Sequence, residues 1–198
     1  MRKRIVMLNG PARCGKDTLA EMLVQRHGFK HFKFTSSLKE RVHGLYGMPD
    51  KPHDAFDSVK DEKRREFLGP RDAYIKVWEK YLVPMHGEGI LIDDLIDKID
   101  NGKDEKIVIS DVGFDREANA IFTYYGDQAM LIKLQRTGCD FRNDIRAYVD
   151  KKTAMVHGKK GLACRQGLIV NNGTKDELLN QFKYCYNAMY QEILYDQL

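Results

Sequence analysis

A phosphate-binding pattern lies near the start of the chain, in LNGPARCGKDTLAEMLV at residues 8–24. Gly10, Gly15 and Lys16 fit the template G-x-x-x-x-G-K-[ST], in which backbone N–H groups surround phosphate oxygens and the lysine reaches the terminal phosphates. The first glycine follows an apolar run and the lysine opens a helical pattern, so the N-terminus of that helix would face an anion. We therefore expect this loop to bind nucleotide phosphates, through Gly10, Ala12, Arg13, Cys14, Gly15, Lys16, Asp17 and Thr18.

Asp17 stands where the template has a hydroxyl residue. A carboxylate is a hard oxygen ligand, so Asp17 could hold magnesium directly or through a water, while Thr18 supplies the hydroxyl. Alternatively, Asp17 only complements the positive end of the helix, an interaction worth about 0.3–1 kcal/mol, and Thr18 alone serves the nucleotide. The sequence leaves both roles open.

Two further polar positions follow apolar runs, where the carboxyl ends of parallel strands form a ligand-binding edge. Asp111 could hold a magnesium-bound water or orient a phosphate acceptor, or it could cap the helix that starts near Asp115. Asn171 and Asn172 could contact a nucleotide base, although Asn-Asn-Gly-Thr is also ordinary turn chemistry. The expected magnesium ligands are thus Asp17, Thr18 and Asp111.

Arginines gather in QRTGCDFRNDIRAYVDKK at residues 135–152. Arg142 and Arg146 are four residues apart, so on a helix both would point at the same object, as in a lid that clamps a transferring phosphoryl group. The alternative is a solvated basic face neutralised by neighbouring aspartates. Arg136, after the fourth apolar run, is a further candidate contact to the nucleotide.

A second helical pattern, GPRDAYIKVWEK at residues 69–80, carries an aromatic pair. Tyr74 and Trp78 lie one helical turn apart, a spacing that packs in a core or lines a base pocket. Arg71 lies in the first turn, after a proline that suits a helix start. Its planar fork could bind a phosphate, or it could be a surface arginine.

Strands and helices alternate along the rest of the chain. Apolar runs predict buried parallel strands at Ile5–Leu8, Ile107–Ile109, Met130–Leu134 and Leu168–Val170, with a weaker one at Phe32–Phe34. Helical periodicity falls between them, at Thr18–Gln25, Ala73–Leu82 and Asp176–Leu194. This alternation predicts a parallel sheet covered on both faces. The polar stretches 47–69 and 136–166 look like excursions from the sheet edge.

Composition indicates one globular domain. The chain has 198 residues, of which 42% are apolar and 31% charged, which excludes a disordered or fibrous protein. A net charge of +4 is small beside 33 basic and 29 acidic residues, so we expect no nucleic-acid partner. The apolar run near the N-terminus is too short to span or enter a membrane. Four widely spaced cysteines predict free thiols in a cytoplasm, and no histidine has ligand spacing.

Three segments resemble bacteriophage-type deoxynucleoside monophosphate kinases. GPARCGKDT at residues 10–18 is similar to the phosphate loop of that family, in which G-K-D-T recurs. IVISDVGFDREANAIF at 107–122 resembles the strand that ends in Asp-Val and the helix after it. GLIVNNGTKDELLNQF at 167–182 is similar to the last strand, the Asn-rich turn and the C-terminal helix. These segments span most of the chain in the family's order.

The resemblance implies a three-layer α/β/α P-loop kinase fold, with a five-stranded parallel sheet of order 2-3-1-4-5. It implies a monophosphate-binding insertion at about 35–100 and a lid at about 136–160, both mobile. The implied reaction moves the γ-phosphoryl group of ATP, with Mg²⁺, to a (deoxy)nucleoside 5'-monophosphate. The implied catalytic residues are Lys16, Asp111, Arg142 and Arg146, and the implied acceptor contacts are Lys39, Arg71, Tyr74, Trp78, Asp111 and Arg116. The resemblance allows a homodimer and, for a phage protein, places it in the host cytoplasm.

Two departures from the family affect the substrate contacts. Gly113 stands where the family has an arginine, for which Arg116 could substitute, and Ser37 stands where the family has a proline before Leu-Lys. Two other functions remain open. The chain could phosphorylate another small acceptor, such as dephospho-coenzyme A, or it could be a non-catalytic ATP-binding module that acts on a partner.

Overall fold

The structure is a computed structural model that describes residues 2–45, 70–142, 144–158 and 161–190. Its contacts divide the chain into two compact units. The first contains the residues up to Lys33 and those from Ile99 onward, and the second is Phe34–Lys98. The second unit covers nearly the same residues as the expected insertion at about 35–100. The polar stretch 47–69 lies outside the described residues.

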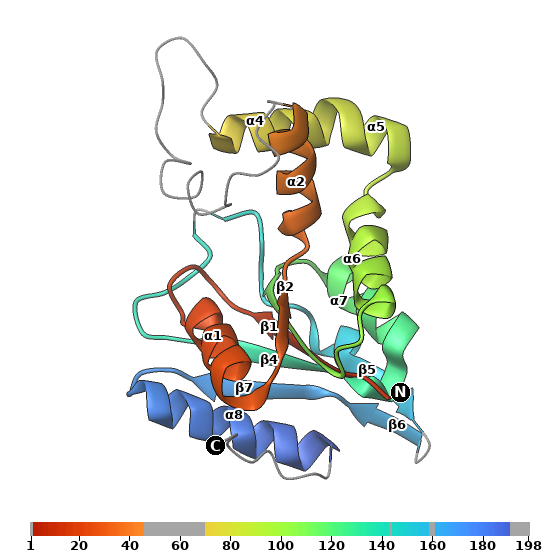
Figure 1. The fold of residues 1–198 in the computed structure, drawn as a ribbon. Helices are drawn as coiled ribbons and strands as arrows, with labels where there is room; N and C mark the ends of the chain where they lie inside the picture. The colour runs from red at the N-terminus through yellow and green to blue at the C-terminus, as the bar shows by residue number, and fades with distance from the viewer. Residues whose placement is uncertain (1, 46–69, 143, 159–160, 191–198) are drawn as a thin grey trace. The chain divides into compact units, whose positions relative to one another are not determined.

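Five parallel strands form the sheet of the first unit (Figure 1). They are β1 (Arg4–Asn9), β2 (Lys30–Phe32), β3 (Lys106–Val112), β4 (Ala129–Gln135) and β7 (Gln166–Val170). Their order is β2-β3-β1-β4-β7, which confirms the expected order 2-3-1-4-5 and the α/β fold class. Since β1 pairs with both β3 and β4, the segments that follow these three strands meet at one edge of the sheet.

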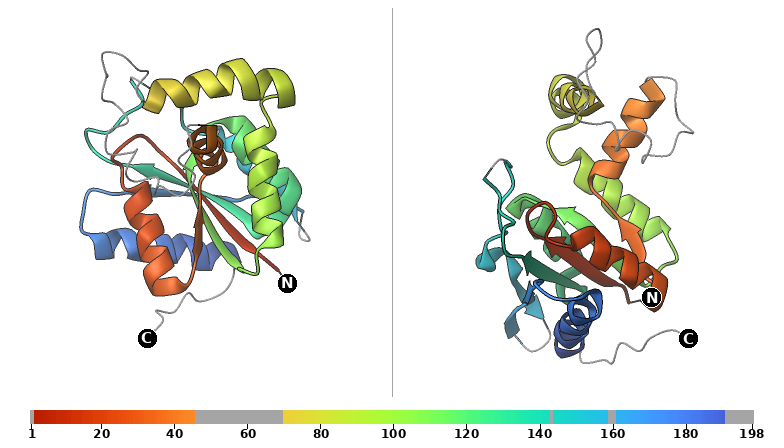
Figure 2. Two further views of the ribbon diagram at one scale, coloured as in Figure 1. Left: turned by 45° about the horizontal axis from the view of Figure 1, so that its top comes forward. Right: turned by 90° about the vertical axis from the view of Figure 1, so that its left-hand side faces the viewer.

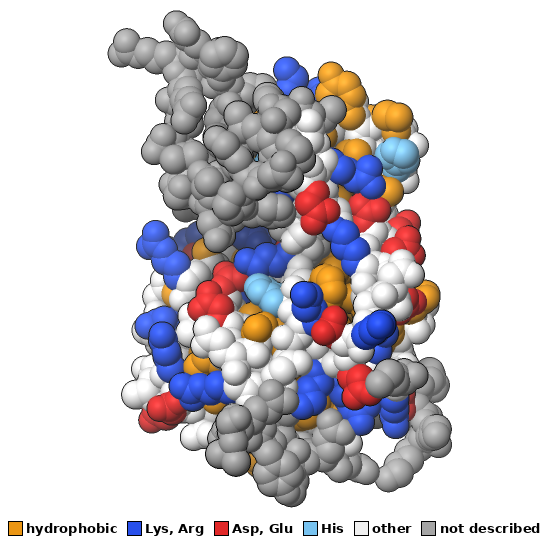
Figure 3. Space-filling view, in the orientation of Figure 1, with side chains coloured by type: hydrophobic (Ala, Val, Ile, Leu, Met, Phe, Trp, Pro, Cys, Tyr) orange, Lys and Arg blue, Asp and Glu red, His pale blue; other side chains and the backbone are white. Residues whose placement is uncertain are grey.

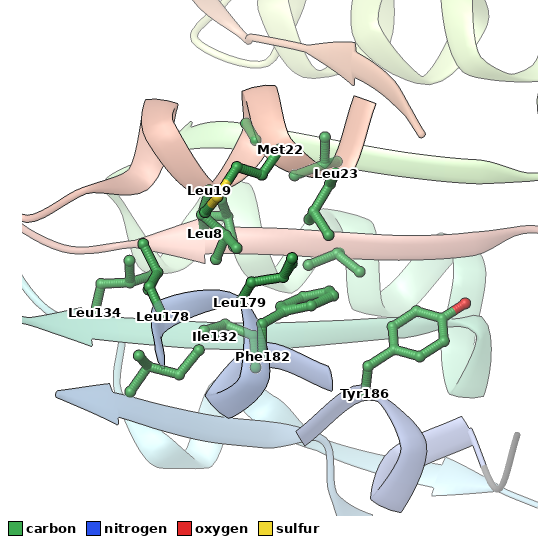
Figure 4. Packing of buried hydrophobic residues seen from close by; sticks show 14 of the residues in the cluster. Leu8, Leu19, Met22, Leu23, Ile132, Leu134, Leu178, Leu179, Phe182 and Tyr186 are labelled. Atoms are coloured by element: carbon green, nitrogen blue, oxygen red, sulfur yellow. The ribbon is translucent and has the colours of Figure 1, made fainter. Parts of the chain in front are cut away.

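Helices cover both faces of this sheet (Figures 1 and 2). On one face, α1 (Lys16–His27) and α8 (Lys175–Tyr190) bury a cluster that includes Leu8, Ile132 and Phe182 (Figure 4). Residues that alternate with these along the strands, such as Met7, face the opposite layer, where α7 (Asp115–Tyr125) packs against β4. Each fully buried Leu or Phe stabilises the fold by about 1.5–3 kcal/mol, so this core holds the strand ends in place.

The outer strand β7 is less buried than its apolar sequence predicts. Ile169 is fully buried, but Leu168 and Val170 are 53% and 47% exposed, because an edge strand has one neighbour and alternate side chains face outward. The side-chain amide of Gln181 donates to the carbonyl of Val170 and accepts from its N–H, at 3.2 and 3.3 Å. These bonds protect part of the strand edge from pairing with another chain.

The short strand β2 lies two residues before its predicted position. It contains Lys30, His31 and Phe32, with His31 opposite Val108 of β3, whereas the apolar run suggested Phe32–Phe34. Phe34 is buried, but it belongs to the second unit. Two phenylalanines with a lysine between them imitate an alternating strand, and this pattern shifted the predicted boundary.

The second unit is helical. It contains α2 (Thr35–Leu45), α4 (Pro70–Val77), a π-helical turn (Trp78–Leu82) and α5 (Val83–His86), followed by α6 (Ile90–Asn101), which continues to the first unit. Pro84 lacks the N–H that would bond to Lys80 in an α-helix, and the turn before it is widened. The buried positions are accordingly Ala73, Val77 and Leu82, whereas Ile75 is 47% exposed.

A two-stranded antiparallel hairpin, absent from the sequence prediction, precedes β7. It consists of β5 (Met155–Gly158) and β6 (Gly161–Cys164), and a 3₁₀ turn at Lys151–Ala154 leads into it. The four cysteines are free thiols, as expected. Within the described residues, no helix combines the length and apolar character needed to cross a bilayer. On the face that Figure 3 shows, acidic and basic side chains lie among one another.

Candidate functional site

The phosphate-binding pattern forms a loop between β1 and α1, at the edge where β1, β3 and β4 end. Gly10 has no room for a side chain, because a Cβ there would lie 2.5 Å from the carbonyl oxygen of Leu134 and 2.8 Å from Sγ of Cys14. Gly15 has φ of 105°, in the left-handed region, and Asn171 fills the space beside it. Arg13 is also left-handed, with φ of 64°. The loop therefore turns tightly at Gly10, while Ala12 and Arg13 are exposed at its tip.

Lys16 is enclosed by the loop that it follows. Its ammonium group donates to the carbonyl oxygens of Gly10 and Pro11, at 2.6 Å each, and lies 3.7 Å from Sγ of Cys14. The residue is only 9% exposed. Burial raises the pKa of the Cys14 thiol although the charge of Lys16 opposes the shift. The thiol is therefore neutral at pH 7 and adds no negative charge to the loop.

Asn171 supports the loop from the far end of the chain. Its side-chain amide donates to the carbonyl of Cys14 at 2.8 Å, and its own N–H donates to the carbonyl of Gln135 at 2.8 Å. The side chain is buried. Asn172, the other candidate nucleotide contact, is exposed, and its side-chain oxygen accepts from the N–H of Thr137 at 2.9 Å. The two asparagines after the predicted strand indicated that a polar contact lies here, but the sequence could not show which of them faces the phosphate loop.

Asp17 is part of a polar chain on the β2 side of the loop. Its Oδ1 atom accepts from Lys33 at 2.8 Å and from the hydroxyl of Ser110 at 3.0 Å, and Ser110 in turn lies 2.7 Å from Nε2 of His31. Burial alone would raise the pKa of Asp17, but the hydrogen bonds and charge of Lys33, with Ser110, lower it overall. Burial and the charge of Lys33 lower the pKa of His31. Asp17 is therefore ionised and His31 neutral at pH 7, with Thr18 half-buried on the same helix.

The end of β3 carries a second carboxylate, Asp111, which is half-buried. Glu117 closes the turn that follows, because one of its carboxylate oxygens accepts from the N–H groups of Gly113 and Phe114, at 2.8 and 3.1 Å. Burial, reinforced by the charge of Asp111, raises the pKa of Glu117 to about 7, against these hydrogen bonds. Arg116 is exposed and its guanidinium stacks over Phe114, 5.1 Å from the ring centroid.

The segment with Arg142 and Arg146 is not helical, so the two arginines do not share a helical face. Residues 136–142 and 144–150 contain no helical residue, and each arginine instead binds the aspartate two positions before it. The N–H groups of Arg142 and Arg146 donate to Asp140 and Asp144, both at 3.0 Å, and the guanidinium groups bind the same carboxylates. Such local bonds replace those of a helix. The side chain of Arg142 is 87% exposed, but that of Arg146 is 34% exposed.

Arg146 occupies the place beside Gly113. A Cβ at Gly113 would lie 2.6 Å from Cγ and 3.1 Å from Cβ of Arg146, so these two residues fit only because position 113 is a glycine. The resemblance placed an arginine at 113 and suggested Arg116 as its substitute. Arg146 reaches this position from the segment that was expected to be a lid. Arg136, at the end of β4, is exposed.

The expected acceptor contacts lie mainly in the second unit. Tyr74 donates to or accepts from Nε2 of His43 at 2.8 Å, and both Tyr74 and Trp78 pack against the small core of α2 and α4. This packing agrees with the core interpretation of the aromatic pair. Lys39 is half-buried on α2. Arg71 lies in the first turn of α4, but its side chain is outside the described residues.

The oxygen ligands near the loop suit a cation that also binds phosphate. Among the described residues, no three or more His, Cys, Asp or Glu side chains group as a metal site. Asp17, Thr18 and Asp111 supply hard oxygen atoms, which is the ligand type magnesium prefers, and magnesium completes its shell with water and phosphate oxygens. The residues present therefore fit magnesium delivered with a nucleotide better than a preformed, all-protein metal site.

No protein-family model and no curated protein matches the sequence. Among solved structures, a crystal structure of TT1252 from Thermus thermophilus is similar over 93% of this chain and 96% of that chain, with a TM-score of 0.50 and 12% identity. An unliganded sugar kinase from Janibacter sp. HTCC2649 covers 93% and 95%, with a TM-score of 0.41 and 8% identity, a likeness too low to support an argument. The first likeness supports the fold alone. Neither is described as a deoxynucleoside monophosphate kinase, so membership of that family stays a hypothesis.

Proposed function

We propose that this chain is an ATP-dependent phosphotransferase whose acceptor is a (deoxy)nucleoside 5'-monophosphate. The observation that carries the proposal is the loop between β1 and α1. Gly10 lies where a side chain would clash and Gly15 has a positive φ. The ammonium group of Lys16 is bound by the carbonyl oxygens of Gly10 and Pro11 at the edge of a parallel sheet. A buried lysine beside a glycine-containing loop and a helix N-terminus is the arrangement that binds nucleotide phosphates.

Lys16 would exchange its bonds to Gly10 and Pro11 for the β- and γ-phosphate oxygens of ATP. This exchange replaces neutral acceptors with charged ones, and charge-assisted hydrogen bonds are roughly twice as strong as neutral ones. Asn171 would hold the loop in shape through the carbonyl of Cys14. The loop is thus preorganised, and little energy is needed to order it when ATP binds.

Magnesium would be held by Asp17, Thr18 and Asp111 together with phosphate oxygens, and when bound it neutralises charge on the phosphates. A direct contact through Oδ1 of Asp17 would displace Lys33, whereas a contact through Oδ2 or through a water would leave their ion pair in place. Both arrangements require the carboxylate of Asp17 to be ionised, which its lowered pKa provides.

In the transfer itself, a phosphate oxygen of the acceptor forms a bond to the γ-phosphorus while the bond to the bridging oxygen breaks, and ADP leaves. No covalent enzyme intermediate is needed, so positioning and electrostatic stabilisation supply most of the catalysis. Lys16 and Arg146 are the cations that would face the charge on the moving group. Arg142, Arg136 and Arg116 are exposed and are weaker candidates. Lys39 and Arg71 stay candidates for the acceptor phosphate by resemblance.

An acceptor screen tests this function. ADP release is measured with each deoxyribonucleoside and ribonucleoside monophosphate, with dephospho-coenzyme A and with no acceptor. We expect one or more monophosphates to raise the rate well above the acceptor-free rate. Stimulation by dephospho-coenzyme A alone would move the reaction to another acceptor class. ATP binding without stimulation by any acceptor would favour a non-catalytic binding module.

A further inference from the structure

The segment that carries Arg146 is fastened to the edge of the sheet. The backbone N–H of Ala147 donates to the carbonyl of Gly113 at 3.3 Å, and the N–H of Asp150 donates to the carboxylate of Asp115 at 2.7 Å. Val149 is buried, with 1% of its surface exposed. Residues 146–150, here named the Arg146 strap, therefore pack along the turn between β3 and α7.

A single buried side chain joins this strap to the central strand. Asn9, the last residue of β1, is fully buried, and its amide nitrogen donates to the carbonyls of Val112 and Ala147, both at 3.0 Å. Its amide oxygen accepts from the N–H of Val149 at 3.0 Å. Asn9 thus uses both donors and its acceptor to hold β1, β3 and the strap together. A buried amide so fully used fixes geometry more strictly than apolar packing would.

Gly113 leaves the opening into which Arg146 fits. The aliphatic part of Arg146 passes over the glycine, and the guanidinium binds Asp144. The side-chain hydrogen bond from Arg146 is the main reason that the pKa of Asp144 is lowered, and the charge of Lys16 contributes to the same shift. The hydrogen bond to Asp144 raises the pKa of Arg146, and the negative charges of Asp111 and Glu117 contribute to this rise. The guanidinium therefore lies within the electrostatic field of both the phosphate loop and the end of β3.

We propose that Asn9 is a positioning residue that holds Arg146 over Gly113, where the guanidinium meets the transferring phosphoryl group. In the structure the guanidinium of Arg146 forms a salt bridge with Asp144. In the reaction this salt bridge is exchanged for contacts to the phosphoryl group. Arg146 then belongs to a fixed part of the site, since its strap is bonded to β1 and β3. This inference rests on the proposed function for the identity of the bound group, but the placement of Arg146 can be measured without any transfer.

The chain contains its own control for this proposal. Asp140 and Arg142 repeat the local pairing of Asp144 and Arg146, with the same backbone bond at 3.0 Å. Arg142 is nevertheless 87% exposed. The two arginines share their local chemistry and differ in the support from Asn9 and the space at Gly113. A role that came only from charge or local pairing would be shared by both.

Two substitutions at other positions should move the side chain of Arg146 while leaving the arginine itself in the sequence. Asn9→Asp keeps the shape and the acceptor but removes the donor to Val112 and Ala147. Gly113→Ala acts from the other side, by placing a Cβ against Arg146, and it remains informative if Asn9→Asp fails to fold. Gly44→Ala is the matched control, because a Cβ there would have no atom within 4 Å.

The first readout is placement, measured as the rate at which phenylglyoxal modifies each arginine, followed by peptide mass spectrometry. In the unsubstituted protein we expect Arg146 to react more slowly than Arg142. Gly113→Ala and Asn9→Asp should raise the Arg146 rate towards that of Arg142 and leave Arg142 unchanged. An unchanged Arg146 rate in the folded variants would overturn the positioning role.

The second readout is kinetic. Gly113→Ala should lower kcat about 10- to 100-fold, as for a misplaced group in the transition state, and change the KM for ATP by about twofold or less. Arg146→Lys should lower kcat similarly, the double variant no further, and the control Gly44→Ala should leave kcat unchanged. Faster labelling of Arg146 with unchanged kcat, or a double variant with additive losses, would overturn the contact to the phosphoryl group. If the unsubstituted protein transfers phosphate to no acceptor, the proposed function fails and labelling alone decides the placement.

Discussion

Asp17→Asn and Lys33→Met should move the magnesium requirement of the reaction in opposite directions. Lys33 binds Oδ1 of Asp17 at 2.8 Å, so its ammonium group competes with a metal for that oxygen. Removing the ammonium frees the carboxylate, whereas Asp17→Asn removes the negative charge that either cation needs. The pKa of Asp17 is lowered, so the carboxylate is ionised throughout assays near pH 7.5 and protonation does not confuse the comparison.

The expected sizes differ because the two changes remove different interactions. The side chains of Lys33 and Asp17 are 35% and 63% exposed, and such pairs contribute about 0–1 kcal/mol. Lys33→Met should therefore lower the half-saturating magnesium concentration by about fivefold at most, since 1.4 kcal/mol is a factor of ten. Loss of a carboxylate that serves the metal should raise it about tenfold or more.

Initial rates of ADP release at fixed ATP and increasing free magnesium measure both shifts. Lys30→Met, an exposed lysine of β2 three residues before Lys33, is the control for loss of a lysine charge and should change nothing. Asp17→Ser restores the hydroxyl of the usual template and should keep partial activity. An unchanged magnesium requirement in Asp17→Asn would refute the metal role and leave Asp17 as a charge at the helix end.

Two other predictions concern the supports of the site. Asn171→Ala should lower the free energy of unfolding by about 1–3 kcal/mol and weaken ATP binding in calorimetry, because the carbonyl of Cys14 loses its buried donor. Asn172→Ala, at an exposed position, should lower the free energy of unfolding by less than about 1 kcal/mol. Equal losses in the two variants would contradict the role of Asn171. Burial raises the pKa of Glu117 to about 7, so its protonated form stabilises the fold below about pH 4.5 and this contribution, on the order of 3 kcal/mol at most, is lost as the pH rises through 7. Glu117→Gln should flatten the decline in melting temperature between pH 5 and pH 8, and parallel curves would argue against the shift.

The phosphate loop could be predicted because its signals are local. An apolar run, two glycines at fixed spacing, a lysine and a helical pattern all lie within residues 5–25, and the structure places β1, the loop and α1 there. The sheet order came from the resemblance, because strand pairing depends on contacts between distant segments. The π-helical turn before Pro84 was missed because helical periodicity assumes a constant number of residues per turn.

The supports of the site could not be predicted in the same way. Asn9 bonds to Val149, and Asn171 bonds to Cys14, across most of the chain, and no pattern near either asparagine points to its partner. The i, i+4 spacing of Arg142 and Arg146 suggested a shared helical face, and the segment is not helical for a local reason. Aspartates two residues before each arginine offer hydrogen bonds that compete with a helix, and the repeated Asp-x-Arg spacing was the signal that could have revealed this.

Direct detection of the product tests the central claim. ATP labelled in its γ-phosphate is incubated with the acceptor that most stimulates ADP release, and the nucleoside diphosphate is separated and counted for the unsubstituted protein and for Lys16→Ala. Lys16→Ala should melt cooperatively and yet form product more slowly by a factor of about a hundred or more. The reason is that loss of a charge-assisted contact to the moving phosphate costs about 3 kcal/mol or more. Labelled diphosphate formed at the normal rate by folded Lys16→Ala, or no labelled diphosphate from the unsubstituted protein with any monophosphate, would contradict the proposed kinase.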